Sequence, residues 1–201
     1  MEYIAHRINT LEQLRKLPVQ YGAELDLRDD LTGRIYISHH PFEDGENFED
    51  YLREYHHGTM ILNIKSERIE HRVMELIKNY HVKNYFFLDC SFPMIHLLSE
   101  AGEKNIAVRY SEYEGMDTIA AMAGKVDWIW VDTFHTLPID HTTFMRMKEM
   151  GYQLCLVSPE LQGQPEKAEL YMQQIQAEGI RFDAVCSKMD MIEKWMGWER
   201  I

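Results

Sequence analysis

The sequence is poor in positive charge and has no long apolar run. Against 33 acidic residues there are only 21 lysines and arginines, which gives a formal net charge of −12. Because nucleic-acid backbones are bound by clustered basic side chains, this balance argues against nucleic acid as a partner. No stretch has the length and hydropathy of a membrane-spanning helix, so no integral membrane segment is expected.

Cysteines are few as well. Cys90, Cys155 and Cys186 lie in apolar, strand-like runs without C-x-x-C spacing, which predicts core thiols rather than disulfides or zinc ligands. The N-terminus enters a strand-like run directly, without the charged flank and apolar run of a signal peptide. We therefore expect a cytoplasmic protein. The glycine-rich nucleotide loop and the catalytic-serine elbow are also missing.

What the sequence does contain is a regular alternation of apolar, strand-like runs with helical stretches. Alternation of this kind predicts a parallel sheet, and eight repeats in 201 residues predict a single α/β domain, residues 1–201, folded as a small TIM (β/α)8 barrel. A hairpin-like insertion is expected from Arg34 to His39. The predicted strands are 2–6, 22–28, 59–65, 84–90, 106–111, 127–132, 153–158 and 182–187, and the predicted helices are 10–17, 47–56, 67–80, 93–103, 116–123, 141–150, 166–178 and 189–198.

Polar residues fall at the C-terminal end of nearly every predicted strand. In a TIM barrel these ends share one rim, which is where barrel enzymes carry their catalytic residues. Strand ends also become polar because they meet loops, and that is the simpler reading of the same pattern. The residues are His6, Asp26, Asn63, Asp89, Arg109, Asp132, Ser158 and Ser187.

The stretch from Tyr3 to Pro41 concentrates chemically useful side chains. Alternation in AELDLR places Glu24, Asp26 and Arg28 on one face of a strand, and two carboxylates held in this way suit a hard divalent cation. His6 and His39 each follow a short apolar strand. Because an imidazole has a pKa of roughly 6.5, such a pair can exchange protons at neutral pH. The alternative without a functional site is that the acidic strand end and the scattered histidines are simply solvated.

Arg7, beside His6, offers a planar guanidinium that matches a pair of phosphate oxygens. Taken in order, HR, then NT before a helix, then GAELD, then TG followed by HH resembles the glycerophosphodiester phosphodiesterase family, which is related to phosphatidylinositol-specific phospholipase C. The resemblance implies a phosphodiester hydrolase that uses Mg²⁺ or Ca²⁺. By position it implies catalytic or phosphate-binding roles for His6, His39, Arg7 and Lys65, and metal-ligand roles for Glu24, Asp26 and Asn63.

The chain departs from the family pattern in its first loop, where Ile8 follows Arg7 in place of the usual glycine, and at His40, which replaces an acidic residue. The third metal carboxylate falls on Asn63, whose amide offers one neutral oxygen. We therefore expect a weakly held ion, with Asp89 or water completing its shell. Asp89 and Arg109 are also candidate substrate contacts.

Three functions remain open from the sequence. The leading hypothesis is a metal-dependent hydrolase of a small phosphodiester, with His6 and His39 as acid and base. A second is a barrel that binds a phosphate ligand without turnover, because Asn63 has replaced a carboxylate. A third is Schiff-base chemistry at Lys65, which leaves the ordered histidines and carboxylates unexplained. Neither the substrate alcohols nor the oligomeric state follows from the sequence.

Overall fold

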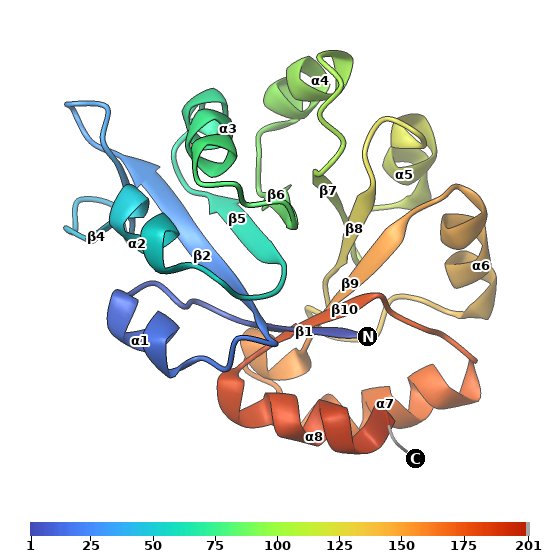
Figure 1. Ribbon diagram of the computed structural model, residues 1–201. Coiled ribbons are helices and arrows are strands. Elements are labelled where there is room, and N and C mark those ends of the chain that lie inside the picture. The colour runs from blue at the N-terminus through green and yellow to red at the C-terminus, as the bar shows by residue number, and fades with distance from the viewer. Residues whose placement is uncertain (200–201) are drawn as a thin grey trace. The chain divides into compact units, whose positions relative to one another are not determined.

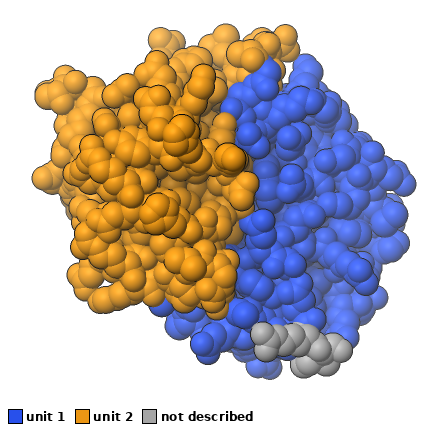
Figure 2. All heavy atoms as spheres, viewed as in Figure 1, with its two compact units in different colours: residues 1–3, 102–201 blue, residues 4–101 orange. Residues whose placement is uncertain are grey.

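The computed structural model describes residues 1–199. The chain divides into two compact units, which Figure 2 shows in different colours: unit 2 comprises residues 4–101, and unit 1 comprises residues 1–3 together with the chain from residue 102. Nearly all of the candidate site residues belong to unit 2, whereas Arg109 belongs to unit 1. The single domain inferred from the sequence stays a prediction.

Unit 2 is built on parallel strands. The strand β1 (Glu2–Ala5), whose last two residues belong to unit 2, pairs through them with β2 (Gly22–Asp29); β2 pairs with β5 (Met60–Ile64), and β5 with β6 (Tyr85–Leu88). The register places Asp26 beside Asn63. Because parallel strands run in one direction, the polar residues at their carboxyl ends meet at the same edge of the sheet.

An antiparallel extension follows β2 (Figure 1). The strand β3 (Ile35–Ile37) pairs with the end of β2, and β4 (Glu46–Asn47) pairs with β3. This is the insertion predicted at Arg34 to His39, lengthened by a short extra strand. Beyond β3 the chain runs back along β2, where the Ser38 amide donates to the Asp26 carbonyl at 3.0 Å. That return brings His39 to the strand carboxylates.

The helices of unit 2 are α1 (Leu11–Lys16), α2 (Phe48–Glu54), α3 (Glu70–Asn79) and α4 (Phe92–Glu100). Side-chain caps explain where the first two begin. Thr10 and Gln13 form a reciprocal capping box at α1, and the Asn47 side chain accepts two backbone N–H groups at α2. The α1 cap fixes the chain immediately after the first candidate residues, His6 and Arg7.

Unit 1 repeats the parallel pattern. The strands β7 (Ala107–Tyr110), β8 (Trp128–Val131), β9 (Gln153–Val157) and β10 (Ala184–Ser187) pair in chain order. Its helices are α5 (Met116–Met122), α6 (His141–Glu149), α7 (Ala168–Ala177) and α8 (Met189–Glu199). In Figure 1, α7 and α8 lie together, and a Lys194–Glu169 ion pair of 2.9 Å joins them. Two short 3₁₀ helices, η1 (Pro159–Gln162) and η2 (Pro165–Lys167), follow β9.

Both faces of β2 are buried. Leu25 and Leu27 on one face are fully buried, and Glu24 and Asp26 on the other face are each only 1% exposed. Apolar residues are expected at such positions, since burying a carboxylate is costly unless it is paired and hydrogen-bonded. The two acidic residues therefore occupy interior positions that stability alone would not assign to them.

All predicted strands and helices are present in residues 1–199, with ends that differ by at most three residues. Left-handed backbone at Arg68 (φ 73°) and Gly102 (φ 90°) explains why α3 begins later and α4 ends earlier than predicted. In this described part of the chain, no helix combines the length and the hydropathy needed to cross a membrane.

Candidate active site

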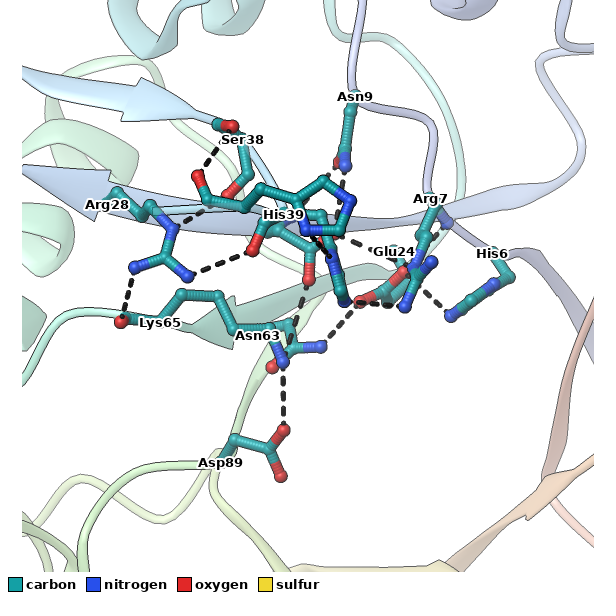
Figure 3. Close-up of polar contacts among 12 residues, drawn as sticks. His6, Arg7, Asn9, Glu24, Arg28, Ser38, His39, Asn63, Lys65 and Asp89 are labelled. Carbon is teal, nitrogen blue, oxygen red and sulfur yellow. Dashed lines mark hydrogen bonds and ion pairs between the residues drawn. The ribbon is translucent and has the colours of Figure 1, made fainter. Parts of the chain in front are cut away.

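Side chains from several segments of unit 2 meet at the carboxyl ends of its parallel strands (Figure 3). Some of these side chains lie on the strands β2 and β5. The others lie in the segments that directly follow β1, β3, β5 and β6. The predicted residues that come together in this way are His6, Arg7, Glu24, Asp26, His39, Asn63, Lys65 and Asp89.

Glu24 is held at both of its oxygens. One oxygen accepts the Arg7 backbone N–H at 2.7 Å, and the other accepts the Asn63 amide at 2.8 Å. Burial, followed by the nearby charge of Asp26, raises the pKa of Glu24 to about 7. The two hydrogen bonds therefore offset only part of the cost of a buried charge, which is the environment that a bound cation would stabilise.

Arg7 adopts a left-handed backbone conformation with φ of 54°, which is rare and unfavourable for a residue with a side chain. This conformation turns its N–H toward Glu24. Its side chain runs to Asp26, with Nε 4.0 Å from Oδ2, and to His39, with Nη2 2.5 Å from Nε2. The strained turn thus lets one residue contact two different parts of the site.

Asp26 is oriented by a residue for which the sequence predicted no site role. Asn9 donates from Nδ2 to Asp26 Oδ2 at 2.8 Å and accepts the Asp26 backbone N–H at 3.0 Å. Only its place in the Asn-Thr pair before α1 could have signalled this role. The other oxygen, Asp26 Oδ1, has no hydrogen-bond partner, and Lys65 Nζ lies 3.6 Å away. Lys65 also donates to Asp89 at 3.1 Å.

Burial disfavours the protonated form of both histidines. Burial, followed by the charge of Arg7, lowers the pKa of His6 from 6.5 to about 4, and His6 Nε2 lies 3.7 Å from Glu24. The pKa of His39 is also lowered, first by burial. Because a guanidinium can only donate, the short contact with Arg7 requires His39 Nε2 to be an acceptor. Each ring therefore has a nitrogen that can take up a proton.

A second residue that the sequence reasoning did not assign to the site is Arg28. Its guanidinium donates to the backbone carbonyls of Ser38, His39 and Lys65. The one sequence feature that could have indicated a site role for Arg28 is the alternation of AELDLR, which places it on the same strand face as Glu24 and Asp26.

Arg109 lies in unit 1, where its guanidinium pairs with the buried carboxylate of Asp132. Asp132 also accepts the Thr133 amide at 3.0 Å and the Gln162 side chain at 2.6 Å. This strand-end cluster is held together by its own residues. A substrate-binding role for Arg109 stays a prediction.

Unit 2 contains buried oxygens of the kind that a hard cation takes as ligands. Within residues 1–199, no group of three or more His, Cys, Asp and Glu side chains is arranged to hold a metal ion. Yet Asp26 Oδ1 and Asn63 Oδ1 are buried oxygens without a hydrogen-bond partner, beside the carboxylate of Glu24. Such oxygens are costly to bury, and Mg²⁺ or Ca²⁺ takes ligands of this kind. Two carboxylates and one amide would supply less charge than three carboxylates.

Solved structures of known enzymes share this architecture over nearly the whole chain. A glycerophosphodiester phosphodiesterase from Agrobacterium tumefaciens aligns with a TM-score of 0.66 and 12% identity, covering 96% of this chain and 99% of that one. The chain has the fold of the glycerophosphodiester phosphodiesterases. A glycerophosphoryl diester phosphodiesterase from Parabacteroides distasonis aligns with a TM-score of 0.70 and 12% identity, covering 98% and 86%. The enzyme from Thermotoga maritima aligns with a TM-score of 0.64 and 18% identity, covering 97% and 96%.

These likenesses confirm the predicted resemblance at the level of fold, and with it the α/β TIM-type barrel class. Comparisons with family models and with curated proteins gave no match. At the identities of these solved structures, the likeness establishes the fold and leaves the chemistry to be argued from this chain's own residues.

Proposed function

We propose that the protein is a metal-dependent phosphodiester hydrolase of the glycerophosphodiester phosphodiesterase type, acting on a small phosphodiester. The observation that carries the proposal is one cluster in unit 2, in which two histidines, an arginine and a lysine surround a pair of buried carboxylates. A fold shared with enzymes of that name supports it.

Arg7 and Lys65 are the phosphate-binding groups in this proposal. The Arg7 side chain is 48% exposed and its guanidinium can bind two phosphate oxygens at once. Lys65 is 21% exposed and supplies a second positive charge beside Asp26. Its pairing with Asp26 and Asp89 gives no support to Schiff-base chemistry, which needs an unengaged amine.

We assign His6 as the general base because its low pKa of about 4 keeps its ring neutral. As the new P–O bond forms, the proton of the attacking hydroxyl passes to His6. His39, once it has taken up a proton from solvent, donates that proton to the leaving oxygen as the old P–O bond breaks. Because His39 is less deeply buried than His6, it is the ring that can recover a proton from solvent between turnovers.

When bound by Glu24, Asp26 and Asn63, Mg²⁺ or Ca²⁺ would polarise a phosphoryl oxygen and offset charge in the transition state. The chain's own contribution is to orient these ligands. Arg7 and Asn63 fix the Glu24 carboxylate, and Asn9 fixes that of Asp26. An amide at Asn63 predicts an ion held less tightly than by three carboxylates.

The proposal is tested by assaying the purified protein against a panel of glycerophosphodiesters in EDTA, in Mg²⁺ and in Ca²⁺. We expect hydrolysis of at least one substrate, dependent on added metal, and its loss in His6→Ala. The matched control is His141→Ala, a unit 1 histidine whose ring contacts the Glu178 carbonyl. Absence of hydrolysis under every condition would refute the enzymatic proposal.

A second candidate, a phosphate-binding protein without turnover, is favoured by one contact. Asn63 turns its Nδ2 toward Glu24 at 2.8 Å, so it partly satisfies the carboxylate without a metal. In this case the protein would bind inorganic phosphate, detectable by calorimetry and weakened by Arg7→Ala, while every diester in the panel stays intact.

A further inference from the structure

Arg28 occupies the end of β2, and its guanidinium binds backbone carbonyls. Nε donates to the Ser38 carbonyl at 3.2 Å, Nη1 to that of Lys65 at 3.0 Å, and Nη2 to that of His39 at 2.9 Å. Figure 3 shows the side chain between the segment after β3 and the segment after β5. One planar group therefore joins two parts of the chain that are far apart in sequence.

The segment that contains His39 has few other constraints. The strand β3 ends at Ile37 and β4 begins at Glu46, so His39 lies outside the antiparallel ladder. The Ser38 amide is tied to Asp26, but the two carbonyls that follow it, those of Ser38 and His39, are both held by Arg28. Arg28 therefore holds the backbone on either side of the His39 side chain, where the Ser38 hydroxyl also donates to the His40 carbonyl at 3.1 Å, and Arg7 contacts the His39 ring itself.

The same guanidinium holds the backbone of Lys65 immediately after β5. The donors of a guanidinium lie in one rigid plane and point in fixed directions. Hydrogen bonds from this group to both segments therefore fix the distance between the two segments and keep each of them ordered. A lysine at this place would have a single ammonium on a flexible stem and could not fix three carbonyls in one plane.

We propose that Arg28 is a positioning residue: it fixes His39 and Lys65 relative to each other, and so places the proton donor against the phosphate contact without touching the substrate. This inference rests on the proposed function for the roles of the two residues. Because proton transfer and phosphate binding must occur on one bound group, an error of about 1 Å in their separation can reduce turnover by roughly a hundredfold.

The test compares Arg28→Met with Arg34→Met. Arg34 is in the same hairpin, but its guanidinium pairs with the side chains of Asp30 and Asp44. We expect Arg28→Met to lower kcat roughly 10- to 100-fold with a smaller rise in KM, and added guanidinium ion to restore part of the loss. Arg34→Met should stay within about twofold of the wild type.

A further variant, Arg28→Lys, and a measurement that does not depend on turnover show whether Arg28→Met has merely unfolded. Hydrogen exchange at residues 38–40 and 65–66 should rise about tenfold or more in Arg28→Met, less in Arg28→Lys, and not in Arg34→Met, with the rest of the protein unchanged. If the wild type hydrolyses no diester, the proposed function fails, but this exchange result still decides whether Arg28 holds the two segments.

Two outcomes would overturn the inference. One is wild-type kcat and exchange in Arg28→Met. The other is an equal loss of kcat and of melting temperature in Arg28→Met and Arg34→Met, because the effect would then be general weakening of the hairpin.

Discussion

The buried carboxylates at the strand ends of unit 1 are fully satisfied by their neighbours. Both oxygens of Asp132 have partners, from the Arg109 and Gln162 side chains and a backbone amide. Glu160, which is 4% exposed, accepts hydrogen bonds from Ser158 and Ser187, and Trp195 donates to Ser158 at 2.8 Å. These networks have the completeness expected of groups that stabilise a fold.

The strand ends of unit 2 differ in this respect. Asp26 Oδ1 and Asn63 Oδ1 are buried without a hydrogen-bond partner, although both residues lie among other polar groups. Arg7 and Asp89 have left-handed backbone, with φ of 54° and 60°. Unpartnered oxygens and strained backbone both cost stability, and they tend to persist where a ligand or a reaction requires them. The contrast supports the proposal that the active site lies in unit 2.

The largest expected effect is on turnover. His6→Ala or His39→Ala should reduce kcat by roughly a hundredfold or more, because each removes one partner in proton transfer. Steady-state kinetics on a hydrolysed diester measures this. Circular dichroism should show an unchanged fold, and a near-normal rate in either variant would mean that the assigned role is wrong.

The opposite behaviour is expected in unit 1. Glu160→Ala leaves the buried hydroxyls of Ser158 and Ser187 without their acceptor, so the free energy of unfolding should fall by about 1–3 kcal/mol. The kcat of the folded fraction should be unchanged. Denaturant unfolding and kinetics together check this, and a specific loss of kcat would place catalytic groups in unit 1 as well.

A smaller effect is expected for Arg7→Lys. The variant keeps the positive charge but loses the planar pair of donors, so KM for the diester should rise roughly tenfold while the fold is retained. Arg53→Lys is a suitable control, since Arg53 is an exposed partner of Asp50 on α2. Equal KM values for wild type and Arg7→Lys would remove Arg7 from the phosphate contacts.

The smallest effect concerns stability against pH. The pKa of His6 is about 4 in the folded protein, whereas its ordinary value is 6.5. Between these two pH values the unfolded chain therefore binds more protons than the folded protein, and stability rises as pH rises from 4 to 6.5. The pKa of Glu24 is about 7 against 4.5, so the folded chain binds more protons and stability falls as pH rises from 4.5 to 7.

The two contributions therefore oppose each other between pH 4.5 and 6.5. In Glu24→Gln, metal-free stability should rise more steeply with pH over this window than in the wild type. In His6→Ala it should rise less or fall. Urea unfolding at several pH values in EDTA makes the measurement, and parallel curves for all three proteins would show that neither pKa is shifted as described.

Much of the fold was accessible from the sequence because its signals are local. The alternation of AELDLR placed Glu24 and Asp26 on one face, and the apolar runs located every strand that the sequence analysis proposed. The 3₁₀ helices η1 and η2 were not predicted as such, since short 3₁₀ turns have little periodicity of their own.

The site contacts were less accessible because they depend on tertiary register. The bonds from Asn9 to Asp26 and from Arg28 to the backbone of His39 follow from how β2 meets the turn after β1 and the return after β3. Nothing in the spacing of these residues along the chain encodes that geometry. The unpartnered oxygen of Asn63 is visible only once its amide has been placed against Glu24.

The most direct test of the contrast between the units is calorimetric titration of Ca²⁺ and Mg²⁺ into four proteins. These are the wild type, Asn63→Glu, Asp26→Asn and Asp132→Asn, of which the last changes a buried strand-end aspartate of unit 1. We predict weak binding in the wild type and in Asp132→Asn, tighter binding in Asn63→Glu, and none in Asp26→Asn. Binding that is unchanged by Asp26→Asn and Asn63→Glu, or abolished by Asp132→Asn, would contradict the placement of the site in unit 2.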